Sequence, residues 1–293
     1  MIDIILNNLI PFIIILTILV FVHELGHYLI ARKNGVKVEV FSIGFGKELF
    51  GFSDKNETRW KFSLIPLGGY VKMHGDLDEA STKKNDSSEI IAGKSFHEKT
   101  VYQRSMILIA GPAANFIFSF VLLIFINIFY GISIDKPEIS YVEKDMPAYN
   151  SGLKEGDLIL EIDGNKIEKF SQIKIFIKNK NNQSINLLFS RDGKVSQVKV
   201  NVIDNIIGIR GKIENKKLNF IESFKESLLQ IYNFTKLTLV GVYEIITGNR
   251  GTDELGGPIR IAELSGDFWS KGLHSTLWFM MIISLNLGLI NLF

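Results

Sequence analysis

The stretch that decides the fold is FIIILTILVFVHELGHYLIARKNG, residues 12–35. It begins as an uninterrupted apolar run of the kind that crosses a lipid bilayer. His23, Glu24 and His27 then appear before the apolar run is complete. Since ionisable side chains are costly inside a membrane, their presence on a spanning helix indicates a functional site rather than ordinary packing.

The composition of the whole chain is that of a mixed protein, with some membrane spans and some water-facing parts. Hydrophobic residues make up 46% of the sequence, and the mean hydropathy is +0.19. The net charge of +2 gives no indication of a nucleic-acid partner. The chain has no cysteine, which excludes disulfides, a cysteine nucleophile and a cysteine-ligated metal.

Three segments are long and apolar enough to span a membrane. The first, residues 4–31, lacks the basic start and the cleavage site of a signal peptide. Pro11 marks a boundary or a kink near its start. The second span lies within residues 106–134, and the third begins near residue 275 and continues to Phe293. As domains, we therefore predict spans at 1–34, 105–134 and 273–293, the last one incomplete.

The distribution of basic residues predicts the orientation of the spans. Residues 1–31 contain no lysine or arginine, whereas residues 32–104 are rich in both. The positive-inside rule places such a loop in the cytoplasm and the N-terminus outside. The long segment after the second span then lies on the outer side of the membrane.

The outer segment has the pattern of a small α+β domain followed by an amphipathic helix. Short apolar runs predict strands at residues 139–143, 157–163, 184–191 and 195–203. Residues 171–179 predict a short helix with Ser171 as its N-cap. Residues 220–248 predict an amphipathic helix that lies along the membrane surface and does not cross it.

The opening motif, H-E-x-x-H, has a specific chemical meaning. On a helix, His23 and His27 are one turn apart on the same face, so both imidazoles can bind one Zn²⁺ ion. The glutamate between them can take a proton from a water molecule at the metal. The alternative is a structural role as a pair of packed histidines, but three ionisable groups at this spacing are hard to assign to packing.

Zinc needs a third protein ligand, and the neighbouring sequence does not supply one. The H-x-x-G-x-x-H continuation of some soluble proteases is absent, because Ile30 and Lys33 occupy the two key positions. Glu39, Glu48 and Glu57 lie in strand-like sequence rather than on a helix. Neither pattern of soluble zinc proteases is therefore supported.

Several motifs in order resemble the site-2 protease family, in the bacterial RseP-type form of a zinc intramembrane metalloprotease. The resemblance covers nearly the whole chain, and the segments that carry it are VHELGHYLIAR (22–32), FSIGFGKELF (41–50), WKFSLIPLGGYVKMHGD (60–76), RSMILIAGPAANFIFSFVL (104–122), LGGPIRIAE (255–263) and SLNLGLINLF (284–293). It implies a polytopic α-helical membrane protein with a cytoplasmic re-entrant β-hairpin and an inserted PDZ domain.

The resemblance also implies roles for individual residues. His23 and His27 would bind Zn²⁺, Glu24 would activate water, and Asn115 would support the transition state or orient the substrate. Within loop 35–104, a hairpin at residues 36–73 would offer a strand edge to the substrate, with substrate-binding residues at Gly44, Phe45, Gly46, Gly68 and Gly69. Plain turn roles for the glycines and a helix–helix hydrogen bond for Asn115 remain open.

The outer domain resembles a PDZ domain over residues 138–210. MPAYNSGLKEGDLILEIDGNKI, residues 146–167, is similar to that family's signature. In the bacterial permuted form, the peptide-binding loop follows the last strands, which implies that Ile207, Gly208 and Ile209 hold a peptide C-terminus. A purely steric role, in which the domain excludes large substrates, is the alternative.

The expected function follows from the resemblance: regulated intramembrane proteolysis in the bacterial inner membrane. The expected substrates are single-span membrane proteins, such as an anti-sigma factor or signal-peptide remnants. The third zinc ligand is expected in an L-D-G motif that would follow Phe293, so we expect this sequence to be a fragment. The alternative is a catalytically inactive, membrane-anchored PDZ adaptor with a relic H-E-x-x-H motif.

Overall fold

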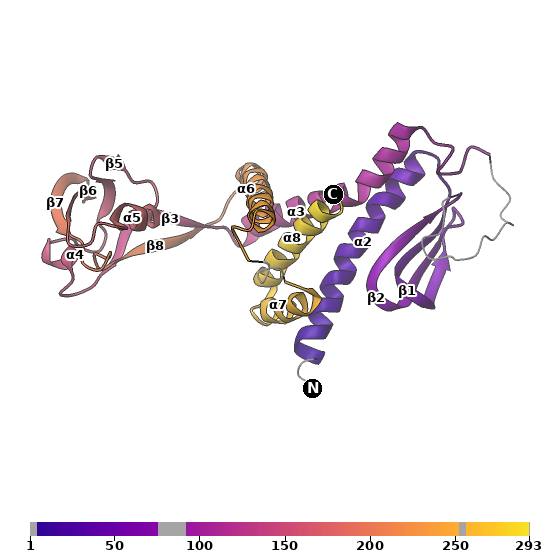
Figure 1. Cartoon of the computed structure of the whole chain (residues 1–293), viewed down its shortest axis with the longest axis horizontal. Coiled ribbons are helices and arrows are strands. Elements are labelled where there is room, and N and C mark those ends of the chain that lie inside the picture. Colours follow the sequence, from indigo (N-terminus) through magenta and orange to yellow (C-terminus); the bar gives the residue numbers. More distant parts are fainter. Residues whose placement is uncertain (1–4, 76–91, 252–255, 293) are drawn as a thin grey trace. The chain divides into compact units, whose positions relative to one another are not determined.

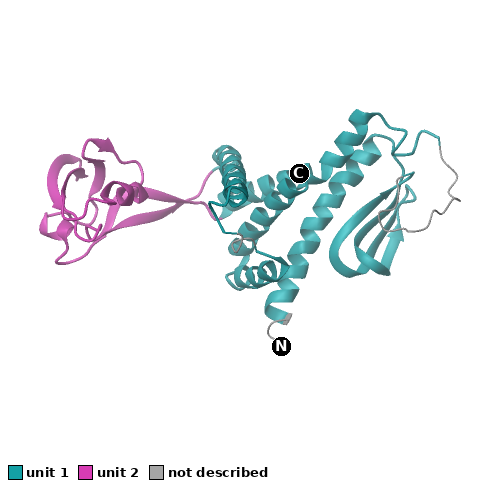
Figure 2. Ribbon diagram, viewed as in Figure 1, with its two compact units in different colours: residues 1–129, 219–293 teal, residues 130–218 magenta. Residues whose placement is uncertain are grey.

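The computed structural model describes residues 5–75, 92–251 and 256–292. The chain forms two compact units (Figure 2). Unit 1 comprises residues 1–129 and 219–293, and unit 2 comprises Tyr130–Leu218. Unit 1 is built mainly from long helices, whereas unit 2 is built mainly from strands, so each is described separately.

Three helices of unit 1 are long and apolar enough to cross a membrane: Leu6–Lys33, Val101–Phe129 and Leu273–Ile290. The first consists of a short π-helix, η1 (Ile5–Leu9), and α2 (Ile10–Lys33), with Pro11 in the first turn of α2. The others are α3 (Val101–Phe129) and α8 (Leu273–Ile290) (Figure 1). The fold is that of a multi-pass α-helical membrane protein.

The third span differs at its end from the sequence prediction. The predicted element reaches Phe293, but α8 ends at Ile290, and residues 291–292 form a turn. Asn291 closes the helix through its backbone N–H, which contacts the carbonyls of Leu287 and Leu289. Phe293 lies outside the described residues.

Small residues let the three spans approach closely. A Cβ atom at Gly26 of α2 would lie 2.7 Å from the Cβ of Ala114 and would also meet the carbonyl oxygen of Ala110, both on α3. On α8, a Cβ at Gly288 would lie 3.1 Å from the carbonyl oxygen of Pro112. Such small residues at helix crossings are typical of membrane bundles, where backbone proximity replaces the hydrophobic effect.

A β-hairpin, β1 (Val38–Ser53) and β2 (Arg59–Met73), follows α2. Its strands bend, so that Phe41 lies opposite both Trp60 and Val71. Gly44 and Gly46 adopt φ values of +88° and +85°, which glycine reaches without strain. The hairpin exposes many large apolar side chains, as expected if lipid covers it: Phe45, Leu49, Phe50, Phe52, Phe62, Leu64, Ile65 and Leu67.

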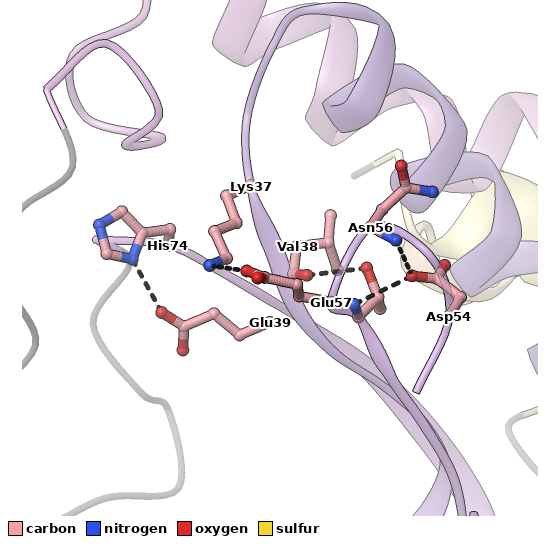
Figure 3. Close-up of polar contacts among 8 residues, drawn as sticks. Lys37, Val38, Glu39, Asp54, Asn56, Glu57 and His74 are labelled. Carbon is pink, nitrogen blue, oxygen red and sulfur yellow. Dashed lines mark hydrogen bonds and ion pairs between the residues drawn. The ribbon is translucent and has the colours of Figure 1, made fainter. Parts of the chain in front are cut away.

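Polar contacts fasten the start and the turn of the hairpin (Figure 3). In the turn, the Asp54 carboxylate accepts hydrogen bonds from the Asn56 backbone and from the Trp60 indole, at 2.8 and 3.0 Å. It also accepts one from the Tyr28 hydroxyl of α2 at 3.0 Å. Lys37 pairs with Glu57 at 2.7 Å across the two ends of the hairpin. The hairpin is thereby tied to the helix that carries the H-E-x-x-H motif.

Two further helices complete unit 1. α6 (Phe220–Ile246) begins with a capping box formed by Asn219 and Glu222, and α7 (Pro258–Ser270) precedes α8. The Asn127 amide of α3 donates to Ser227 of α6 at 3.0 Å. Among the described residues, α6 is not one of the helices apolar enough to span a membrane.

Unit 2 is a β domain with two short helices. Its elements are β3 (Ile132–Val142), α4 (Pro147–Asn150), β4 (Leu158–Ile162), β5 (Asn165–Lys166), α5 (Phe170–Ile177), β6 (Ser184–Arg191), β7 (Lys194–Asn201) and β8 (Ile209–Lys216). The strand order is β7-β6-β4-β3-β8, with β5 paired to β4. The alternating strands bury an aliphatic core that includes Ile139, Ile159, Ile162, Ile185, Leu187 and Val200.

The predicted N-cap at Ser171 is wrong. The helix α5 begins one residue earlier, at Phe170, and Lys169 is the N-cap residue. The backbone N–H groups of Glu168 and Lys169 donate to the Gln172 side chain at 2.8 and 3.0 Å. The Ser171 N–H instead donates to the Asp135 carboxylate at 3.0 Å. The Asp135 carboxylate on β3 thus accepts an N–H from the first turn of α5. The sequence pattern instead predicts Ser171 as the capping acceptor.

Candidate metal centre

The two histidines of the motif face each other on α2. The distance between the Nε2 atoms of His23 and His27 is 3.2 Å. Two nitrogen ligands of a tetrahedral zinc ion, each about 2.0–2.1 Å from the metal, lie about 3.3 Å apart. The spacing of four residues, one helical turn, therefore places the two nitrogens at a separation suited to one shared ion.

The carbonyl oxygen of Ile107 orients His27. It lies 2.7 Å from His27 Nδ1, and since a carbonyl can only accept, Nδ1 must carry the proton. In a neutral imidazole the other nitrogen, Nε2, then has a free lone pair. This is the arrangement that metal-binding histidines usually show, with the outer N–H donated to an oxygen.

Asn115, on α3, contacts the second ring. Its Nδ2 atom lies 3.1 Å from His23 Nδ1, and since an amide nitrogen only donates, His23 Nδ1 is the acceptor. The proton of a neutral His23 ring then lies on Nε2 and points to the lone pair of His27 Nε2. A continuous chain of hydrogen bonds thus runs from Asn115 through both rings to the Ile107 carbonyl.

Gly111 keeps a space open beside both Nε2 atoms. A Cβ atom at this position would lie 2.7 Å from His23 Nε2 and would also meet His27 Nε2. A side chain as small as alanine would therefore fill the place that an ion bound to both nitrogens needs. Ile107, Gly111 and Asn115 are spaced four residues apart, so all three lie on one face of α3. The residues present fit a metal ion.

Glu24 lies next to the histidines, where the hairpin passes α2. Its side chain is half-buried, and within the described part of the chain its carboxylate makes no hydrogen bond or ion pair. A Cβ atom at Gly69 would lie 3.0 Å from Glu24 Cγ and 2.7 Å from Val20 Cγ1. The absence of a side chain at Gly69 thus lets the backbone of β2 approach the glutamate.

No third His, Cys, Asp or Glu joins His23 and His27 within residues 5–75, 92–251 and 256–292. The candidate centre therefore has two protein ligands within these ranges, and a tetrahedral zinc site with three protein ligands requires one more.

The other predicted hairpin residues lie in its bend. Gly44 approaches the strand opposite, because a Cβ there would lie 2.8 Å from the Ile65 carbonyl oxygen. Gly68 has a φ of +150°, and the ring of Phe45 covers it. Of the four glycines predicted to bind substrate, Gly69 is the one at which a Cβ would meet the Glu24 side chain.

The predicted peptide-binding residues lie in unit 2. The carbonyl of Ile207 accepts the Ala148 N–H, and the carbonyl of Gly208 accepts the Glu143 N–H, both at 2.9 Å. Gly208 has a φ of +80°, and Ile209 is the first residue of β8. These contacts fix the loop, whereas peptide binding there stays a prediction.

Two contributors to the site were missed by the sequence analysis: Gly111 and the Ile107 carbonyl. A signal for Gly111 was present, because it opens the segment GPAAN, residues 111–115, one turn before Asn115. The Ile107 carbonyl has no residue-type signal, since any residue offers a carbonyl. Its exposure to His27 depends on how closely α2 and α3 pack at Gly26.

The chain is similar to known proteins over most of its length. Residues 11–293 match the model of Peptidase family M50. A Rhizobium meliloti protein named "Putative zinc metalloprotease" is 34% identical over 96% of this chain and 81% of its own length. "Zinc metalloprotease RasP" of Geobacillus kaustophilus is 29% identical, and the match covers 98% of this chain and 86% of the relative.

A solved structure matches part of the chain. The PDZ domain of an SdrC-like protein from Listeria monocytogenes has 25% sequence identity to it, with a TM-score of 0.24. That match covers 27% of this chain and 90% of the Listeria domain. The family match spans nearly the whole sequence and includes both histidines of the motif. The chain belongs to peptidase family M50.

Proposed function

We propose that this protein is a zinc-dependent endopeptidase that cleaves single-span membrane proteins within or next to the bilayer. His23 and His27 hold the zinc, and a third ligand comes from a residue outside the described ranges. Zinc, when bound, supplies Lewis acidity that polarises the scissile carbonyl. The zinc metalloprotease names of the relatives support the choice of metal.

Glu24 acts as the general base. Its carboxylate lies one residue from His23 and is not held by other groups among the described residues, so its oxygens are available to a water molecule. It takes a proton from the attacking water and delivers it to the amide nitrogen of the leaving peptide. The half-buried position limits competing bulk water, which strengthens the electrostatic interactions inside the site.

The hairpin presents the substrate. A peptide bond in a transmembrane helix is protected by the helix's own hydrogen bonds, so the substrate must be extended before attack. An extended segment can add to the edge of a β-sheet through main-chain hydrogen bonds. The approach of Gly69 to Glu24 supports a role for β2 in bringing such a segment to the general base, with Gly44, Phe45, Gly46 and Gly68 shaping the bend.

We infer a location in the bacterial inner membrane, with the N-terminus and unit 2 outside and loop 32–104 in the cytoplasm. Anti-sigma factors and signal-peptide remnants are substrates of the size expected for such an enzyme. Unit 2 either binds a peptide C-terminus near Ile207, Gly208 and Ile209 or excludes substrates with large outer domains. Both roles act on the same substrates.

One observation supports the proposal most strongly: the 3.2 Å separation of the two Nε2 atoms beside a space that a Cβ at Gly111 would fill. Packed histidines of purely structural function need neither a shared direction for their Nε2 atoms nor a glycine opposite them. A general base without another partner lies one residue away. Together these features have the composition of a hydrolytic metal centre.

The test is proteolysis by the protein expressed from its complete reading frame. Wild type, Glu24→Gln and a matched control, Glu263→Gln, are each combined in membranes with a reporter substrate of a single span. Glu263 lies exposed on α7. We expect cleavage by wild type and the control, and a loss of at least about 100-fold in Glu24→Gln. Equal cleavage by all three would contradict the proposal, and a complete lack of cleavage would favour the adaptor alternative.

A further inference from the structure

We propose that Asn115 is the positioning residue for His23, and that rotation of its side-chain amide sets which ring nitrogen of His23 is free to bind metal. The inference rests on the proposed function, because it concerns the same metal centre. It assigns Asn115 a role that acts through a histidine, in place of direct contact with the substrate.

The location of Asn115 is the first argument. Its side chain is fully buried, and its Nδ2 atom is 3.1 Å from His23 Nδ1. Its Oδ1 atom is also buried and has no hydrogen-bond partner among the described residues. Buried amide oxygens nearly always have a partner, so a lone acceptor next to an imidazole indicates an arrangement in which that acceptor is used.

The backbone around Asn115 is firmly held. Its carbonyl oxygen accepts hydrogen bonds from the hydroxyls of Ser119 at 2.9 Å and Ser284 at 3.0 Å. Ser284 belongs to α8, so two helices fix this point of α3. The amide can therefore turn about its last torsion while its Cα stays in place. A half-turn exchanges Nδ2 for Oδ1 and presents an acceptor to His23.

The two orientations have different consequences for His23. With Nδ2 facing the ring, as the structure shows, Nδ1 accepts, and the proton of the neutral ring lies on Nε2. With Oδ1 facing the ring, Nδ1 carries the proton and donates it, and Nε2 has a free lone pair. Only the second tautomer can offer Nε2 to a metal ion. His27 is already held in that tautomer by the Ile107 carbonyl.

The contrast between the two rings explains the choice of residue. A backbone carbonyl such as that of Ile107 can only accept, so it locks one tautomer. A side-chain amide can serve both tautomers, so the same residue supports His23 before and after metal uptake. Aspartate could support the metal-binding tautomer, because its oxygens accept, whereas leucine of similar size could support neither.

The first measurement is zinc affinity, by competition with a chromophoric chelator, on the purified full-length protein. Asn115→Leu is expected to weaken zinc binding about 10–100-fold, as loss of an outer hydrogen bond to a metal-binding histidine does elsewhere. Asn115→Asp is expected to restore affinity close to wild type. The matched control is Asn127→Leu, because Asn127 is a buried amide on the same helix that contacts Ser227 and Gln230 instead.

The second measurement reads the His23 tautomer without metal. The chain has five histidines, so ¹⁵N-histidine labelling with assignment by substitution is practicable. In metal-free wild type we expect the His23 proton on Nε2, and in Asn115→Leu a mixture of tautomers. Unchanged tautomer and unchanged zinc affinity in Asn115→Leu would overturn the inference while leaving the proposed function intact. A wild type that binds no zinc would overturn the function, and the metal-free spectra would still decide the inference.

Discussion

A comparison of His74 with the pair His23 and His27, all in unit 1, shows how the same type of side chain can serve different roles. His74, which follows β2, is buried, and its Nδ1 atom donates to the Glu39 carboxylate at 2.8 Å (Figure 3). Its backbone N–H also donates to the Lys37 carbonyl at 2.8 Å. His23 and His27 have oriented outer nitrogens too, but their Nε2 atoms point at each other and at the space beside Gly111.

The difference teaches that a candidate metal centre is recognised by the unfilled space beside its ligands as much as by the ligands themselves. A carboxylate beside His74 marks a hydrogen bond that tightens the start of the hairpin. A glycine beside His23 and His27 marks room for a group that the protein itself does not provide. Substitutions at Gly111 and at His74 should therefore separate metal binding from the stability of the fold.

The largest effect is expected for Gly111→Ala. The new Cβ would lie 2.7 Å from His23 Nε2 and would also meet His27 Nε2, closer than real Cβ contacts allow. We expect zinc affinity and cleavage to fall by more than about 100-fold, a loss greater than that of an outer hydrogen bond. Zinc content and cleavage of the reporter substrate measure the change.

The matched control for this substitution is Gly241→Ala. Gly241 is also a helical glycine, on α6, and among the described residues a Cβ there would meet only Arg250 Nη1, at 3.4 Å. It should leave zinc binding unchanged and should not lower the melting temperature, because alanine favours a helix more than glycine does. Full zinc content in Gly111→Ala would show that the space beside the histidines is not the metal site.

The sequence predicted the candidate ligands of this site but not the groups that orient their rings. H-E-x-x-H has a fixed helical spacing, so His23, Glu24 and His27 could be found from the letters alone. The tautomers depend on the Ile107 carbonyl and the Asn115 amide. Both groups reach the histidines only because α2 and α3 pack closely, and single-sequence patterns do not encode the rotation of one helix against another.

The fold shows the same division. Long apolar runs identified the spans, because bilayer thickness fixes their length. The bends of β1 and β2, in contrast, arise from pairing on both sides of Phe41, which is a long-range property. Strand β8 was missed because its sequence, IRGKIENK, is polar and has little alternation. It forms through pairing with β3 along one edge of the sheet.

A smaller effect is expected for His74→Leu, and it concerns the stability of the fold rather than zinc binding. The substitution removes the hydrogen bond to Glu39, and the carboxylate is partly exposed, so water can compensate in part. We expect a loss of about 1–2 kcal/mol in the free energy of unfolding, measured by thermal unfolding of the full-length protein. Zinc content should stay at the wild-type level. A loss of zinc without a loss of stability would remove the distinction between the two sets of histidines.

The smallest effect is expected at Asp54, and it depends on pH. Partial burial disfavours the charged form, but the hydrogen bonds from Trp60, Asn56, Thr58 and Tyr28 outweigh it and lower the pKa of Asp54 to about 2. A carboxyl with a lowered folded-state pKa stabilises the fold above its ordinary value of 3.8. That contribution is lost as the pH falls from about 4 towards 2.

Asp54→Asn removes this titration, so its melting temperature should depend less on pH than that of wild type between pH 4 and about 2. Asp204→Asn, at an exposed position of unit 2, is the control and should behave as wild type. Because Asp54 joins the hairpin turn to Tyr28 of α2, the same variant should loosen the hairpin while zinc stays bound. Identical pH profiles in wild type and Asp54→Asn would mean that this carboxylate does not hold the hairpin to the helix of the metal centre.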